Sequence, residues 1–277
     1  MVAETVDANA YCAELVRRED RDRFLCALFA APQARGDLLA LYAFYREVAR
    51  VPAIVSEALI GHMRLQWWRD RLDGIYRGEG APAGYPVGQA LAEAIVRHGL
   101  RRAAFDPLLD ALGDAVDGIE HENLAALERH AEATAGSIAA LSLAILGVAD
   151  ERAAAAGRHV AIAWHLVGSL RAIPYRGQAG RLPFPLAWGE GGGRQSTGLS
   201  DCVSRLAGVA AGHLREARKL GVGLPQAAWP ALLPATLADG YLRRLRRNDF
   251  DPYDEGLRAV GAGGVARLGW NAWRGRF

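Results

Sequence analysis

The chain has 277 residues, of which 51% are hydrophobic and 23% charged, so it can build a large core and global disorder is excluded. Its formal net charge of +2 is too small for a typical nucleic-acid-binding protein, and no nucleic-acid partner is expected. Cys12, Cys26 and Cys202 are far apart and form no CxxC pair, which argues against a disulfide framework or a zinc site.

The sequence carries neither the apolar segment of a signal peptide near Met1 nor an apolar run of about 18 residues. These patterns predict a cytoplasmic protein. A basic run, Arg243-Arg244-Leu245-Arg246-Arg247, has two interpretations. It is the solvated end of a helix or a contact with anionic lipid, so attachment to a membrane surface stays open.

Apolar residues recur at helical spacing along the whole chain, and no strand-like alternation persists. The expected helices cover residues 22–30, 59–77, 87–98, 107–116, 134–146, 152–172, 199–220 and 231–247, with another beginning at Pro32. Pro174 is expected to end the helix at 152–172, and residues 258–274 are weakly patterned. Gly-rich stretches predict loops at 78–86 and 189–198, the second of them flexible. The pattern therefore predicts an all-α chain, with residues 1–277 as a single domain.

Several stretches share their order and spacing with one known family. They are Asp37 to Arg46, the segment Arg64-Leu65-Gln66-Trp67-Trp68-Arg69-Asp70, Thr134 to Ser137, and Leu170-Arg171 followed by Gly180 to Pro185. Together they resemble the squalene/phytoene synthase family over roughly residues 10–250. The resemblance implies an isoprenoid-synthase-type helical bundle with a central cavity.

In that family, the resemblance further implies, two prenyl diphosphates are joined head to head. Magnesium ions neutralise the diphosphate, and two aspartate-rich helices hold the ions because magnesium prefers carboxylate oxygens. Aspartates at i and i+4 lie on one face of a helix and can reach the same ions.

This chain departs from the pattern at both aspartate-rich motifs. Aligning the segments puts the acidic positions at Ala49, Arg50, Ala53, Ala172, Tyr175 and Arg176. Glu47 stands two positions too early to substitute for them. The resemblance therefore gives this chain no catalytic residue, no metal ligand and no cofactor. Cations at Arg50 and Arg176 repel magnesium and favour direct contact with phosphate.

A second interpretation keeps the chain active, as a magnesium-dependent prenyltransferase that condenses prenyl diphosphates in isoprenoid biosynthesis. Its metal ligands would then lie elsewhere, among Asp110, Asp114, Asp117, Glu47 and Glu57. The first three fall at i, i+4 and i+7, which is also the pattern of a solvated helix face. Magnesium would be a cofactor only under this interpretation.

The first interpretation is a pseudoenzyme that binds an isoprenoid-like lipid or a protein partner. The candidate ligand-binding residues are Tyr42, Arg46, Arg50, Trp68, Arg171, Arg176 and Arg181. The arginines either converge as an anion site at the cavity mouth or are scattered on the surface. Trp67 and Trp68 either line a lipid cavity, or one ring packs into the core and the other lies at the rim. His165 is expected to be a core histidine.

One branch of the family resembles this chain in its Leu-Gln-Trp-Trp-Arg segment and its weakened aspartate motifs. That branch includes a mitochondrial factor for the assembly of respiratory complex I. The resemblance thus implies a role in assembly or lipid handling at a membrane.

Overall fold

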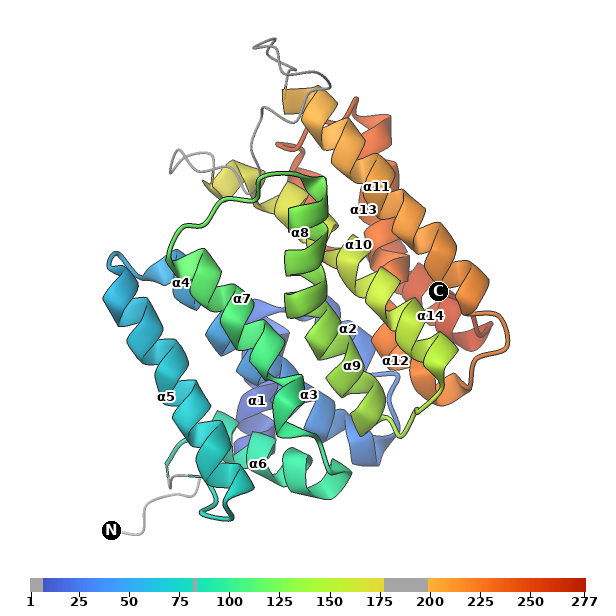
Figure 1. Cartoon of the computed structure of the whole chain (residues 1–277). Coiled ribbons are helices and arrows are strands. Elements are labelled where there is room, and N and C mark those ends of the chain that lie inside the picture. The colour runs from blue at the N-terminus through green and yellow to red at the C-terminus, as the bar shows by residue number, and fades with distance from the viewer. Residues whose placement is uncertain (1–6, 82–83, 177–198) are drawn as a thin grey trace.

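The structure, a computed structural model, describes residues 7–81, 84–176 and 199–277, with side chains up to Tyr175 in the second range. Every regular element in this part of the chain is helical (Figure 1). The first half holds α1 (Ala8–Glu19), α2 (Arg21–Ala27), α3 (Pro32–Ala49), α4 (Val51–Ile54), α5 (Ala58–Tyr76), α6 (Pro86–His98), η1 (Arg102–Ala104), α7 (Asp106–Val116) and α8 (Leu124–Ala131). The second half holds η2 (Glu132–Gly136), α9 (Ser137–Ile145), α10 (Glu151–Arg176), α11 (Leu199–Leu220), η4 (Gln226–Ala228), α12 (Trp229–Leu232), α13 (Pro234–Arg247), η5 (Glu255–Leu257) and α14 (Ala262–Trp273). The predicted all-α class is confirmed.

Local chemistry explains where the helices begin. The Asp7 carboxylate caps α1 by accepting from the backbone N–H groups of Asn9 and Ala10, and the Asn123 side chain caps α8 in the same way. Pro32 and Pro86 occupy the first positions of α3 and α6, where a missing N–H leaves no bond unmade. The predicted start of α3 at Pro32 is confirmed, and the predicted bounds of α5, α6, α7 and α11 agree with the structure to within one residue.

The predicted end of the 152–172 helix is wrong, because α10 runs through Pro174 to Arg176. A proline in the last turn removes a single backbone hydrogen bond, that of its own nitrogen to the carbonyl four residues earlier. Ile173 next to it is fully buried, and its packing favours continued helix. Pro174 therefore lies inside the helix.

Among the helices that were not predicted from the sequence are α1 and α8. In α1 only Cys12, Leu15 and Val16 are buried, so its apolar stripe is narrow. In α8 the buried side chains are Leu127 and Ala131 alone. Stripes this narrow are hard to distinguish from a polar loop without knowing the neighbouring helices.

The buried side chains form two groups. The amino-terminal core surrounds Phe44 and takes residues from α1, α3, α5, α6, α7 and α9, while the carboxy-terminal core lies along α10 and takes residues from α8, α11, α12, α13 and α14. Residues 38–44 of α3 are all buried, so this helix is enclosed on every side. Both α2 and α9 contribute to each core. That the two cores unfold as a single domain stays a prediction.

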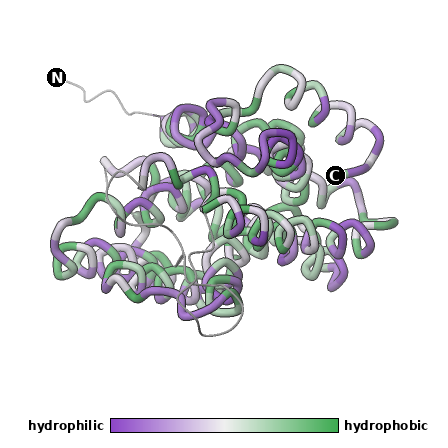
Figure 2. Tube along the Cα trace, turned by 90° about the horizontal axis from the view of Figure 1, so that it is seen from above, coloured by the Kyte–Doolittle hydropathy of each residue, from purple (hydrophilic) through white to green (hydrophobic). Residues whose placement is uncertain are grey.

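Hydrophobic and hydrophilic residues are interleaved along the helices (Figure 2). Among the described helices, none combines the length and the apolar character needed to cross a membrane.

Candidate functional site

The first degenerate motif lies where α3 gives way to α4. The long helix ends at Ala49, Arg50 caps it, and α4 starts at Val51 with Pro52 in its first turn. Ala49 is half-buried, whereas Arg50 and Ala53 are exposed. No side-chain oxygen ligand stands at any of the three motif positions.

Charged side chains around this end of α3 are paired with one another. Glu19, at the end of α1, accepts from Arg46 at 3.3 Å and lies 4.0 Å from Nη1 of Arg50. Glu47 accepts a hydrogen bond from the Tyr85 hydroxyl. Burial raises the pKa of Glu47 above its ordinary value. Two arginines thus meet at this site, and both nearby carboxylates already have partners.

The second degenerate motif ends α10. Ala172 is half-buried, Tyr175 is 62% exposed, and neither offers a carboxylate. The structure does not describe the side chain of Arg176. Arg181 and the loop predicted at 189–198 also lie outside the described residues. Whether those two arginines converge with Arg46 and Arg50 stays a prediction.

The magnesium cluster that the fold family uses does not fit the residues at these two helix ends. Magnesium needs oxygen ligands, and alanine, tyrosine and arginine stand at the described positions where carboxylates are required. Nowhere in residues 7–81, 84–176 and 199–277 do three His, Cys, Asp or Glu side chains gather closely enough to hold a metal ion. The arginines at the end of α3 add positive charge, which opposes a divalent cation.

Arg171 has a partner for each of its three nitrogens. Nη1 donates to the Asp22 carboxylate at 2.9 Å, and Nε and Nη2 donate to the carbonyls of Leu257 and Arg258 at 2.7 and 3.1 Å. Its guanidinium also lies 4.0 Å from the ring centroid of Tyr241, whose hydroxyl donates to the same carboxylate at 2.9 Å. Arg171 therefore ties α10 to α2, α13 and η5.

A second buried arginine lies on α2. Arg23 is 8% exposed and donates to Asp20 at 2.6 Å. Its guanidinium stands 4.6 Å from the Tyr45 ring and 5.9 Å from the Tyr42 ring. Burial raises the pKa of Tyr42 to about 12, so its phenol stays protonated at neutral pH.

These side chains form one polar layer that joins the two cores. We define the polar layer as Asp20, Asp22, Arg23, Tyr42, Arg171 and Tyr241. Four of its members were not among the predicted site residues: Asp20, which caps α2, Asp22 and Arg23 in that helix, and Tyr241 in α13. A signal was present, because the charged run at residues 17–23 continues directly into the apolar residues 24–28, and charges inside an apolar helix need buried partners.

The paired tryptophans divide between core and rim. Trp68 is 4% exposed and packs edge-on against Phe44, with ring centroids 4.8 Å apart, while Trp67 is 38% exposed. Tyr42 is equally buried, at 4%. His165, expected in the core, is half-buried with its Nδ1 3.4 Å from the Thr134 hydroxyl oxygen. Any ligand that touched Tyr42 or Trp68 would have to displace packed neighbours.

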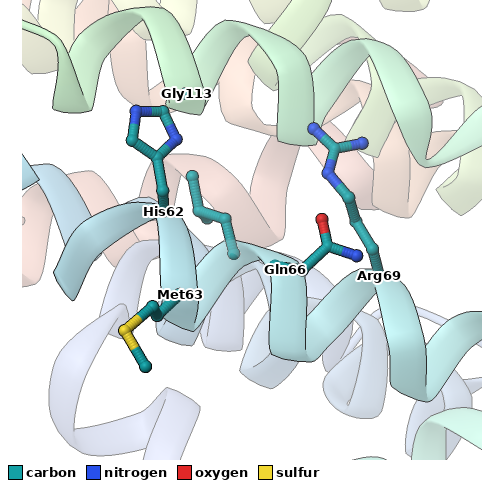
Figure 3. Close-up of a pocket in the computed structure, with 6 residues that line it drawn as sticks. His62, Met63, Gln66, Arg69 and Gly113 are labelled. Carbon is teal, nitrogen blue, oxygen red and sulfur yellow. The ribbon is translucent and has the colours of Figure 1, made fainter. Parts of the chain in front are cut away.

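The carboxylates of the alternative metal site lie on the outer face of α7 and at its end. Asp110, Asp114 and Asp117 are exposed, as is Glu57. Asp110 accepts from Arg69 at 2.7 Å, and Asp117 is 2.6 Å from Nε2 of His62. Figure 3 shows His62 and Arg69 rising from α5 toward α7, beside a pocket of about 320 Å³. This is the arrangement of a solvated helix face, with Asp110 and Asp117 paired to Arg69 and His62 of the neighbouring α5.

The described part of the chain is an all-helical bundle of the isoprenoid-synthase type. Comparison with known proteins agrees. The squalene synthase HpnC of Alicyclobacillus acidocaldarius superimposes with a TM-score of 0.74 at 20% identity, covering 91% of this chain and 98% of that one. A dehydrosqualene synthase gives a TM-score of 0.75 at 18% identity, covering 98% and 97%. At these identities the likeness shows the fold alone.

The chain belongs to the squalene/phytoene synthase family, whose sequence profile matches residues 16–273. A bovine (Bos taurus) relative is 33% identical over an alignment 278 residues long, which spans 97% of this chain and 83% of the relative. That relative is named NADH dehydrogenase (ubiquinone) complex I, assembly factor 6.

Proposed function

We propose that this chain is a non-catalytic member of its family that acts in the assembly of respiratory complex I. The observation that carries the proposal is the replacement of acidic motif positions by Ala49, Arg50, Ala53, Ala172 and Tyr175 in a preserved fold. The name and 33% identity of the bovine assembly factor support the same role. We propose that the chain works by binding a protein partner or an isoprenoid-like lipid, without a metal cofactor.

The charge at the end of α3 supports a binding role. Arg46 and Arg50 share the single carboxylate of Glu19 at distances of 3.3 and 4.0 Å, so that pairing neutralises only one of the two positive charges. The remaining charge favours an anionic group on the partner or lipid. We propose a cytoplasmic location in contact with a membrane surface, where such a complex is assembled.

Deletion of the gene in its own host tests the proposal, with two readouts. We expect less assembled complex I on native gels and less NADH:ubiquinone oxidoreductase activity, while squalene and carotenoid levels stay unchanged. Returning the full-length gene should restore the complex. A normal amount of complex I together with loss of an isoprenoid product would contradict the proposal and favour a prenyltransferase.

A further inference from the structure

The helices α13 and α14 are neighbours at the carboxy-terminal edge of the bundle (Figure 1). A pocket of about 520 Å³ lies between them. Four arginines line it, and no lining residue is acidic. They are Arg243, Arg244, Arg247 and Arg267. The three on α13 follow Gly240 at i+3, i+4 and i+7, so they share one face of that helix.

Two of these arginines are not neutralised. Arg243 pairs with Asp239, and Arg244 pairs with Asp254 at 2.8 Å. Arg247 and Arg267 form no ion pair or hydrogen bond with the described part of the chain. Residues 256–277 contain arginines at 258, 267, 274 and 276 and no Asp or Glu, so the surplus positive charge extends over the last helix.

The outward face of α14 adds indole rings to this charge. Arg267, Trp270 and Arg274 follow one another at i+3 and i+7, on the side opposite the buried Leu268. Trp270 is 54% and Trp273 77% exposed, with ring centroids 5.3 Å apart. The Arg274 guanidinium lies 4.9 Å from the Trp270 ring centroid.

These two rings do not hold α14 on the bundle. The helix is attached through the buried side chain of Leu268 and the hydrogen bond from Asn271 to Thr236 on α13. Tryptophan is enriched where membranes meet water, because its ring is apolar and its N–H needs a polar partner. Arginine forms bidentate hydrogen bonds with phosphate. The same surface thus offers both groups that an anionic bilayer surface recognises.

We propose that α13 and α14 dock this protein on a bilayer containing anionic phospholipids. The arginine-lined pocket receives headgroup phosphates, and Trp270 and Trp273 enter the interfacial layer. Because the pocket is positively charged, this surface should bind anionic membranes and not neutral ones. This proposal does not depend on the role in complex I assembly, because it rests on the surface alone.

Co-sedimentation of the full chain with vesicles tests the proposal. Vesicles of phosphatidylcholine with phosphatidylglycerol are compared with vesicles of phosphatidylcholine alone, at several salt concentrations. We expect binding to the anionic vesicles only, weakening as salt rises. Each arginine near a charged surface contributes about fivefold to partitioning, so Arg247→Ala with Arg267→Ala should weaken binding about 30-fold. Trp270→Ala with Trp273→Ala should also weaken it.

Matched variants separate this surface from general charge and apolar area. Arg101→Ala with Arg129→Ala removes two exposed arginines elsewhere, and Leu59→Ala with Met63→Ala removes apolar area from α5. Both should bind like the parent. Far-ultraviolet circular dichroism and thermal melting verify that every variant is folded.

Three outcomes overturn the proposal. One is equal binding, or none, to both kinds of vesicle. Another is unchanged binding by folded variants that lack the two arginines or the two tryptophans. The third is release of the bound protein by inorganic phosphate but not by chloride at matched ionic strength, which would make the pocket a site for free phosphate.

Discussion

Arg50 and Arg171 both stand at a degenerate motif, yet their surroundings differ. Arg50 is exposed and lies 4.0 Å from one carboxylate, whereas Arg171 is half-buried and bound at all three nitrogens. Sequence position alone makes them equivalent candidates for anion binding. The structure makes Arg171 part of the packing and leaves Arg50 available to a ligand.

Alanine substitutions should separate the two roles. Arg171→Ala leaves the buried Asp22 carboxylate with only the Tyr241 hydroxyl, so we expect a loss of about 3–5 kcal/mol in the free energy of unfolding. Arg50→Ala removes an exposed, long ion pair and should cost under about 1 kcal/mol. Urea unfolding measures both. A larger loss for Arg50→Ala than for Arg171→Ala would contradict this assignment.

Glu47 makes stability depend on pH. Burial raises its pKa, so the folded protein favours the protonated form. The stabilising effect of protonation is fully present below the unfolded pKa of about 4.3 and is lost as pH rises through the higher folded value. Glu47→Gln keeps an acceptor for Tyr85 without the charge. We expect the variant to be at least as stable as the parent at neutral pH, with the difference shrinking toward about pH 4.

Glu14→Gln is the matched control, because the hydrogen bond from Arg17 lowers the pKa of Glu14. Its carboxylate stabilises the fold above the unfolded pKa, and this contribution is lost as pH falls through the folded value. The control variant should therefore show no gain at neutral pH. A loss of stability in Glu47→Gln at neutral pH would show that the charged form is the one the fold favours.

Close contact between α5 and α7 is sensitive to a single methyl group. A Cβ on Gly61 would lie 2.6 and 2.9 Å from the two methyl carbons of Val116, so Gly61→Ala should destabilise the protein by about 1–3 kcal/mol. Gly208, exposed on α11, has no atom within 4 Å of its Cβ position, and Gly208→Ala should stabilise by about 0.5–1 kcal/mol. Thermal melting checks the opposite signs. Equal shifts in both variants would mean that helix propensity alone decides.

The sequence predicts those elements whose signals are local. The broad apolar faces of α5, α6 and α11, with Pro86 at the start of α6, set their boundaries. Tertiary contacts decide the others. The narrow stripe of α1 becomes a helix because α3 and α6 cover it, and α10 passes Pro174 because Ile173 is buried.

The candidate site divides in the same way. Loss of the acidic motif positions can be read directly from residues 49–53 and 172–176. The polar layer cannot, since Asp22 is satisfied by Arg171 and Tyr241, 149 and 219 residues away. The charged run before residues 24–28 indicates that Asp22 and Arg23 need buried partners, but it does not say which residues those partners are.

At the scale of the whole molecule, we expect the two cores to unfold together. The polar layer links α2 to α10 and α13, and α9 packs into both cores. Differential scanning calorimetry should therefore give one transition whose calorimetric and van't Hoff enthalpies agree. Two resolved transitions would show that residues 1–277 hold two domains.

Loss of metal-dependent chemistry from a preserved fold is tested most directly by a magnesium titration. Isothermal calorimetry of the purified full chain is performed with and without a non-hydrolysable farnesyl diphosphate analogue, beside the Alicyclobacillus acidocaldarius squalene synthase as a positive control. With arginine and alanine where carboxylates are required, we expect this chain to show no magnesium-dependent binding of the analogue. Magnesium-dependent binding like that of the control would contradict the account and show that other carboxylates form a working site.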